Sequence, residues 1–176
     1  FPINSLWMDI AYEADLVNGL GNLASRILTL ASKQPVKFDY SGAGVASADE
    51  AEKFIGVAWK DYIVALDSHA ISDAVQVLVR LIKFADKYVD DSAPWKLIKE
   101  DPAKFQQVIS VLLELLRKLA WLFLPFTPES GEKILIALGV FESENKLSYK
   151  KIQKWGSLNG TREFQKPAGL FPRLQK

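Results

Sequence analysis

The fold is decided by residues 101–124, which read DPAKFQQVISVLLELLRKLAWLFL. This stretch opens with Asp101 and Pro102, which are typical of a helix N-cap followed by the first helical position. Behind them, apolar side chains recur at steps of three and four residues, at Val108, Leu112, Leu115, Leu116, Leu119, Leu122 and Phe123. That spacing gathers them on one face of an α-helix. We therefore expect a helix from Pro102 to about Leu124.

Cap motifs on both sides of this segment indicate further helices. Ser47-Ala-Asp-Glu50 has the form of a capping box. Asp67 or Ser68 can cap the helix that follows, and Thr127-Pro128 repeats the cap-and-proline pattern. Together with the apolar spacing, these signals predict helices at about residues 5–33, 48–66, 67–89, 102–124 and 127–139. Alternating strand patterns are scarce, so the expected fold is all-α, a helical bundle of about five helices.

Residues 146–176 differ from the rest of the chain. Glycine and proline recur in them, which predicts extended chain with a short helix near 148–155. They hold eight basic side chains and one acidic one, a net charge of +7 against −6 for the remainder. We therefore divide the chain into a helical bundle over 1–145 and an irregular basic C-terminal strap over 146–176. Such a tail either meets a polyanion or an acidic partner surface, or is simply solvated.

The composition excludes several classes of chemistry. The chain has no cysteine, which rules out disulfides, thiolate zinc sites and cysteine nucleophiles. Its single histidine, His69, rules out a metal site built from several histidines. No nucleophile elbow, P-loop or dinucleotide-binding glycine pattern accompanies His69. We therefore expect no catalytic residue, no metal site and no cofactor in this chain.

Neither a signal peptide nor a membrane span is expected. Residues 1–15, FPINSLWMDIAYEAD, lack the basic and apolar regions of a secretory signal. The most apolar stretch, residues 108–126, contains Glu114, Arg117 and Lys118, which argue against a membrane span. We expect a cytoplasmic protein, and, because the chain does not begin with methionine, a fragment or a processed chain.

The polar face of the first expected helix has an unusual composition. It holds amide, hydroxyl and guanidinium groups rather than the lysines and glutamates of an ordinary solvated face. Its members are Asp15, Asn18, Asn22, Ser25, Arg26 and Thr29. Asn22 and Arg26 are four residues apart and therefore adjacent on the helix surface. Such side chains can hydrogen-bond the edges of nucleic-acid bases. The alternative is hydrogen bonding between helices inside the bundle.

A second candidate feature is the segment Tyr88-Val-Asp-Asp-Ser-Ala-Pro-Trp95. A helix is expected to end here, an acidic turn follows, and Pro94 presents the indole of Trp95. An indole braced by proline at a helix junction can stack on an unpaired base. Alternatively, Trp95 is a core residue that closes one end of the bundle.

Four blocks of the sequence resemble, in order and spacing, the anticodon-binding domain of methionyl-tRNA synthetases. They are Asp15-Leu-Val-Asn-Gly-Leu-Gly-Asn-Leu-Ala-Ser-Arg26, Tyr88 to Trp95, Pro125-Phe-Thr-Pro128 with Leu138-Gly139, and Leu170-Phe-Pro-Arg173. The resemblance covers about residues 5–174. It implies the helical bundle of the class I aminoacyl-tRNA synthetase anticodon-binding type, which the leucyl, isoleucyl, valyl and cysteinyl synthetases share. The Leu170–Arg173 block favours the methionyl family.

The resemblance implies recognition of the CAU anticodon of methionine tRNA. In the family, an asparagine and an arginine of the first-helix block hydrogen-bond anticodon bases, and these match Asn22 and Arg26. The tryptophan after Ala-Pro stacks on the wobble-position cytosine, and it matches Trp95, with Pro94 beside it. Asn18 and Asp90 occupy positions where the family often has supporting anticodon contacts.

The resemblance also implies a part that is not in this chain. The family's catalytic domain is absent, so the chain is expected to be inactive alone, and ATP would bind that absent domain. The expected partners are methionine tRNA, through its anticodon loop, and the catalytic domain in cis, with no DNA and no membrane. The strap at 146–176 is expected to pack either on the bundle or on that domain. Two alternatives stay open: the anticodon-binding domain of another class I synthetase, and a helical protein-interaction module without an RNA role.

Overall fold

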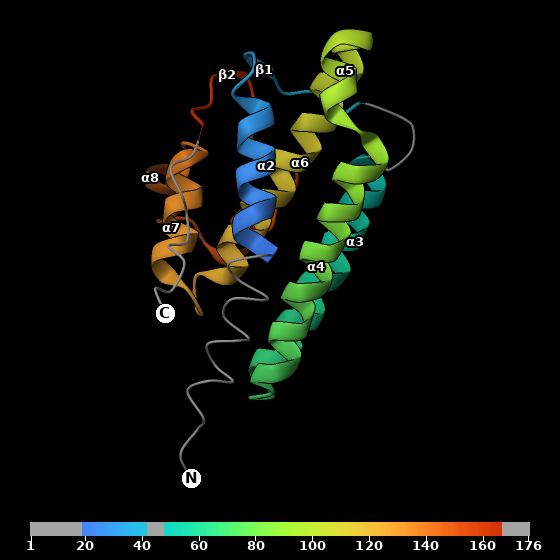
Figure 1. The fold of residues 1–176 in the computed structure, drawn as a ribbon. Helices are drawn as coiled ribbons and strands as arrows, with labels where there is room; N and C mark the ends of the chain where they lie inside the picture. Colours follow the sequence, from blue (N-terminus) through green and yellow to red (C-terminus); the bar gives the residue numbers. More distant parts are fainter. Residues whose placement is uncertain (1–18, 42–47, 167–176) are drawn as a thin grey trace, which may run out of the picture.

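The computed structural model describes residues 19–41 and 48–166 and has the expected helical architecture (Figure 1). The long helices are α2 (Asn22–Ala31), α3 (Ala48–Asp67), α4 (Ile71–Ser92), α6 (Pro102–Phe123) and α7 (Pro128–Ala137). Short helices join them: α5 (Pro94–Glu100), α8 (Phe141–Glu144) and α9 (Tyr149–Ile152). A small antiparallel ribbon pairs β1 (Val36–Lys37) with β2 (Thr161–Arg162). The predicted all-α bundle is confirmed.

Helix α6 is the centre of the bundle. It contacts α2, α3, α4, α5 and α7, and Figure 1 shows it behind α2, between the α3–α4 hairpin and α7. Every residue from Val108 to Ala120 is buried, although the apolar spacing marks only one face. The buried set includes the charged residues Glu114, Arg117 and Lys118. Among the described helices, none is long and apolar enough to cross a membrane.

Most of the predicted helix ends are confirmed. The Asp101 carboxylate caps α6 by accepting a hydrogen bond from the Lys104 backbone N–H at 3.0 Å. Gly139, with φ of +68°, terminates α7 as expected. Thr127 precedes α7, but its side chain makes no capping hydrogen bond. Of the first predicted helix, only the part after residue 18 is described, and the capping serine Ser47 also lies outside the described residues.

The predicted start of α4 is wrong. Asp67 and Ser68 do not cap it, because α3 continues through Asp67 and α4 begins only at Ile71. Between the two helices, His69 adopts a left-handed conformation with φ of 60°, and the Ala70 N–H donates to the Ala65 carbonyl at 2.8 Å. This backbone arrangement closes α3 in the manner that usually requires glycine, so the sequence shows no C-cap signal there.

The described part of the strap packs on the bundle. Leu158 and Phe164 are buried in the core, and Ile152 and Trp155 pack against it while half-buried. Strand β2 lies beside β1, which joins the strap to the segment that follows α2. This ribbon was not predicted, since two residues per strand are too few to show an alternating pattern.

Candidate functional site

The polar stripe of α2 faces outward. Asn22, Ser25 and Arg26 are exposed and Thr29 is half-buried, whereas the apolar residues of the helix lie in the core. Asp15 and Asn18 lie outside the described residues. The described part of the stripe is therefore not taken up by hydrogen bonds inside the bundle. Among its described residues, Arg26 links the stripe to another helix, and this link lies at the surface.

Arg26 joins α2 to α4 through two carboxylates. Its Nη2 donates to Asp90 Oδ1 at 2.6 Å, and its Nη1 donates to Asp86 Oδ1 at 3.3 Å. The Arg26 side chain is 41% exposed, so each pair contributes little stability, about 0–1 kcal/mol. Their main effect is to hold the guanidinium in one orientation.

Asp86 is a site residue that the sequence reasoning missed. Burial raises the pKa of its carboxyl group, Arg26 opposes that rise, and the Asp90 charge adds to it. The available signal was its position four residues before Asp90, which places both carboxylates on the same face of α4.

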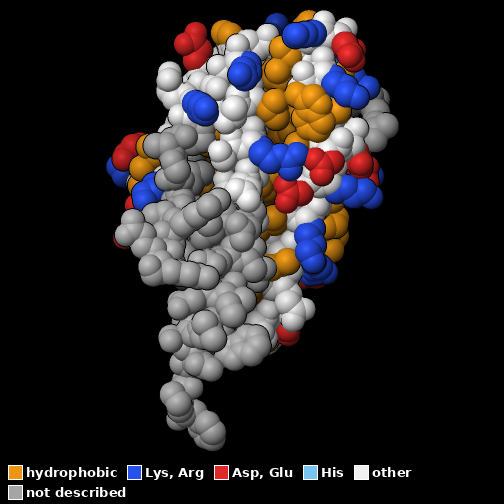
Figure 2. Space-filling model, in the orientation of Figure 1, with side chains coloured by type: hydrophobic (Ala, Val, Ile, Leu, Met, Phe, Trp, Pro, Cys, Tyr) orange, Lys and Arg blue, Asp and Glu red, His pale blue; other side chains and the backbone are white. Residues whose placement is uncertain are grey.

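An open hollow lies between α2 and α4, lined by five polar or charged side chains. Its lining is Asn22, Ser25, Arg26, Asp86 and Asp90. In Figure 2, basic and acidic side chains meet in this region, and hydrophobic side chains gather beyond them toward α5. The surface therefore combines amide, guanidinium and carboxylate groups within one small area.

The segment from Tyr88 to Trp95 reaches this hollow along α4. The predicted acidic turn is wrong, because Asp90 and Asp91 lie inside α4, which ends only at Ser92. Ala93 then turns the chain in a left-handed conformation with φ of 42°, and Pro94 begins α5. Trp95 is 47% exposed, so the alternative that it closes the bundle as a core residue is wrong. Pro94, the residue before it, is buried. Asp90 connects the two features, because it binds Arg26 and stands five residues before Trp95.

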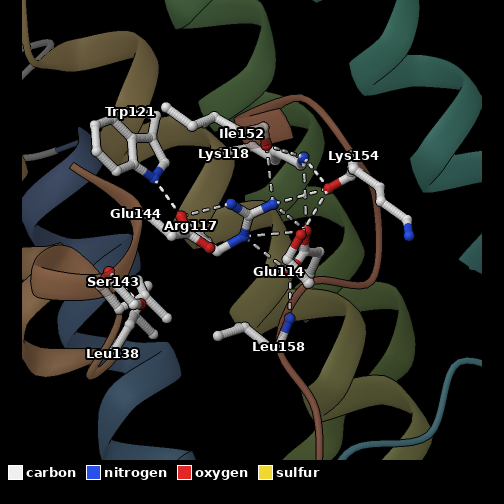
Figure 3. A network of polar contacts seen from close by, with 12 residues as sticks. Glu114, Arg117, Lys118, Trp121, Leu138, Ser143, Glu144, Ile152, Lys154 and Leu158 are labelled. Carbon is white, nitrogen blue, oxygen red and sulfur yellow. Dashed lines mark hydrogen bonds and ion pairs between the residues drawn. The ribbon is translucent and has the colours of Figure 1, made fainter. Parts of the chain in front are cut away.

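A buried charge network on α6 is the most elaborate polar feature of the described residues (Figure 3). Arg117 donates to Glu114 Oε1 at 2.6 Å and to Glu144 Oε2 at 2.8 Å, and Trp121 also donates to Glu144 at 2.7 Å. Burial opposes the Arg117 charge, but the hydrogen bonds and charges of the two glutamates prevail and raise its pKa. In the sequence alone, these charges indicated only that the segment does not span a membrane.

Lys118 extends the network to the strap. Its ammonium group donates to the carbonyls of Ile152 at 2.7 Å and Lys154 at 2.5 Å, and it lies 3.7 Å from Glu114. Its side chain is fully buried, and burial, together with the neighbouring Arg117 charge, lowers its pKa to about 7. Arg117 donates to the same two carbonyls, at 3.2 and 3.0 Å. The network therefore fixes the strap backbone at two points.

Among the described residues, no side chain forms a hydrogen bond or ion pair with His69 that would make it a base. It is exposed in the turn between α3 and α4. Among the described residues, no group of three histidine, cysteine, aspartate or glutamate side chains is arranged to hold a metal ion.

Comparison with known proteins finds similarity to one part of the methionine–tRNA ligases. A family model described as the anticodon binding domain of methionyl tRNA ligase matches residues 42–176. The methionine–tRNA ligase of Bacillus subtilis is 36% identical over 169 residues, and that of Fusobacterium nucleatum is 29% identical over 171 residues. These matches cover 92% and 93% of this chain but 24% and 26% of the two ligases.

The solved structures agree. The ligand-free methionyl-tRNA synthetase of Mycobacterium tuberculosis aligns with a TM-score of 0.80 and 30% identity. The alignment covers 96% of this chain and 34% of that protein. The chain thus spans about a quarter to a third of the proteins it matches.

Proposed function

The chain belongs to the family of anticodon-binding domains of methionyl-tRNA ligases, and we propose that the α2–α4–α5 surface reads the CAU anticodon of methionine tRNA. The observation that supports this most is the arrangement of the exposed side chains. Asn22 and Arg26 face outward on α2, and Arg26 is held by Asp90, from which the chain continues directly to the exposed Trp95.

The chemistry of these side chains suits unpaired bases. Anticodon bases are single-stranded, so a protein can read them by stacking together with hydrogen bonds to their edges. In this proposal Trp95 stacks on the wobble-position cytosine. Asn22 accepts from the amine of that cytosine or donates to a base carbonyl, and Arg26 donates to a carbonyl or ring nitrogen. Stacking supplies about 1–3 kcal/mol per base.

The two carboxylates support Arg26 in this role. A guanidinium presents five N–H donors, and Asp86 and Asp90 engage Nη1 and Nη2 at 3.3 and 2.6 Å. A base approaching the hollow meets a fork that is already oriented, so less side-chain entropy is lost on binding. The carboxylates also disfavour a base edge that presents only acceptors.

Aminoacylation itself is assigned to a catalytic domain in cis. We propose that this chain acts indirectly: the energy of anticodon binding places the acceptor end of the tRNA in that domain. ATP and methionine would bind there. Family membership favours the methionyl over the other class I anticodon domains, and a helical module without an RNA role is the alternative that the experiment addresses.

The test is binding of the chain to RNA hairpins at low salt. One hairpin carries a CAU anticodon loop and the other a changed first base. We expect tighter binding to CAU, and we expect Trp95→Ala to weaken CAU binding about 5- to 150-fold, corresponding to the loss of one stacked base. Low salt preserves the phosphate contribution to a weak complex.

The matched control is Ile136→Ala, which truncates another exposed apolar side chain, 60% exposed on α7. It should leave CAU binding unchanged. Circular dichroism checks that both variants are folded. Equal binding of the two hairpins by the wild-type chain would exclude anticodon reading, and a folded Trp95→Ala variant with full affinity would remove the stacking role.

A further inference from the structure

A second hollow lies where α3 meets the strap. It has a volume of about 370 Å³ and is lined by Glu52, Gly56 and Trp59 from α3 and by Lys150, Lys154 and Trp155 from the strap. None of these residues belongs to the hollow between α2 and α4. We call this the α3–strap groove.

The floor of the groove is open at Gly56. This glycine lies in the middle of α3, and a Cβ added to it would meet no atom of the described residues within 4 Å. A glycine inside a helix lowers stability by about 0.5–1 kcal/mol relative to alanine, and here no neighbouring atom requires it. The open space is therefore available to an incoming group. Trp155 adds an indole N–H that is buried with no acceptor among the described residues.

The rim of the groove is basic on the strap side. From Asn145 to Arg162 the chain carries five basic residues and no acidic one. Lys150 and Lys154, four residues apart, line the groove, and their side chains are exposed. Glu52 is the one acidic residue in the lining, and it belongs to α3. The field at the strap side therefore attracts an anion.

The buried network holds this rim in place. Lys118 and Arg117 both donate to the carbonyls of Ile152 and Lys154, which fixes the backbone between and at the two rim lysines. The Lys118 ammonium also lies 5.6 Å from the centre of the Trp59 ring, in the groove wall. A network with four buried charges contributes little net stability by itself. Its structural effect is to hold the backbone that carries Lys150 and Lys154.

We propose that the α3–strap groove binds a backbone phosphate of the tRNA, as a second RNA contact separate from the anticodon site. The inference rests on the proposed function, which supplies the RNA. Lys150 and Lys154 neutralise the phosphate, and the space above Gly56 admits it. Phosphate contacts of this kind position an RNA and raise affinity without reading its sequence.

The experiment measures binding of full-length methionine tRNA as a function of salt. In Lys150→Ala/Lys154→Ala both backbone carbonyls remain, so the clamp on the strap stays intact. Removing two phosphate contacts should weaken binding about tenfold near 0.1 M salt and reduce the slope of log K against log salt by about 1.4–1.8. The control Lys133→Ala/Lys166→Ala removes two exposed lysines outside the groove. It should change the affinity and the salt slope by no more than half of the changes expected for Lys150→Ala/Lys154→Ala.

Two further variants test the groove with opposite signs. Glu52→Gln removes the opposing carboxylate and should tighten binding. Gly56→Leu fills the space above α3 without changing charge, so it should weaken binding while thermal stability is kept or raised. Affinity and salt slope in Lys150→Ala/Lys154→Ala that match those of the control would overturn the proposal, as would an absence of tRNA binding at low salt.

The two proposals fail separately. The preference for CAU over a changed anticodon should be the same in the groove variants and the wild-type chain, because a phosphate contact carries no base information. If the CAU preference is absent but the lysine dependence is present, only the anticodon proposal fails. If the preference is present and the lysine dependence absent, only the groove proposal fails.

Discussion

Replacing Lys118 should change how the stability of the bundle depends on pH. The Lys118 ammonium is fully buried, and its pKa is lowered to about 7, against about 10.4 for a lysine in an unfolded chain. Between these two values the unfolded state binds more protons than the folded state. The free energy of unfolding of the wild-type chain therefore rises with pH over this window.

The size of the effect follows from the two pKa values. Integrating the proton difference from pH 7 to pH 9 gives a gain of about 2 kcal/mol. For a chain of this length that corresponds to a rise in Tm of roughly 4–8 °C. The range ends at pH 9 because burial also raises the pKa of several tyrosines, Tyr62 to about 12, and their linkage has the opposite sign at higher pH.

Lys118→Met keeps most of the side-chain volume and removes the titrating group. Arg117 still donates to the carbonyls of Ile152 and Lys154, so the strap keeps part of its clamp. Urea unfolding at pH 7, 8 and 9 should show a rising midpoint for the wild-type chain and a nearly flat one for the variant. Lys133→Met, at an exposed lysine, should follow the wild type. Parallel pH profiles for Lys118→Met and the wild type would refute the reasoning.

Three further substitutions separate buried from exposed interactions. Glu114→Gln leaves the buried Arg117 with weaker acceptors and should lower stability by about 3–5 kcal/mol, measured by urea unfolding; a loss under 1 kcal/mol would contradict a buried pair. Asp90→Asn weakens the exposed pair with Arg26 and should change the free energy of unfolding by less than about 1 kcal/mol. The free energy of binding to the CAU hairpin should change by more than the free energy of unfolding. Gly131→Ala places a Cβ 2.9 Å from a carbonyl oxygen of α6 and should lower stability by about 1–3 kcal/mol; an unchanged Tm would show that α7 shifts freely.

The parts of the fold that the sequence predicted are those with local causes. The cap at Asp101, the glycine at Gly139 and the three- and four-residue spacing along residues 101–124 each act within one or two turns of chain, so one sequence suffices to read them. The start of α4 was predicted wrongly because His69 adopts the left-handed conformation that glycine usually adopts at a helix end. A histidine gives no sequence signal for that conformation. At the candidate site, the local sequence offered an exposed Trp95 as one of two alternatives. It could not decide between an exposed and a core position, and the structure shows the exposed one.

The charged residues within 101–124 are an example of a feature that the local sequence does not predict. Glu114, Arg117 and Lys118 stand three and four residues apart, which is also the pattern of a solvated salt-bridged stripe. Their burial depends on partners far along the chain: Glu144 is 27 residues from Arg117, and the Lys154 carbonyl is 36 from Lys118. A backbone carbonyl has no sequence identity, so nothing at position 154 marks it as a partner. The spacing of Glu114, Arg117 and Lys118 thus fits either a solvated helix surface or the buried attachment point of the strap. Only the folded structure distinguishes the two.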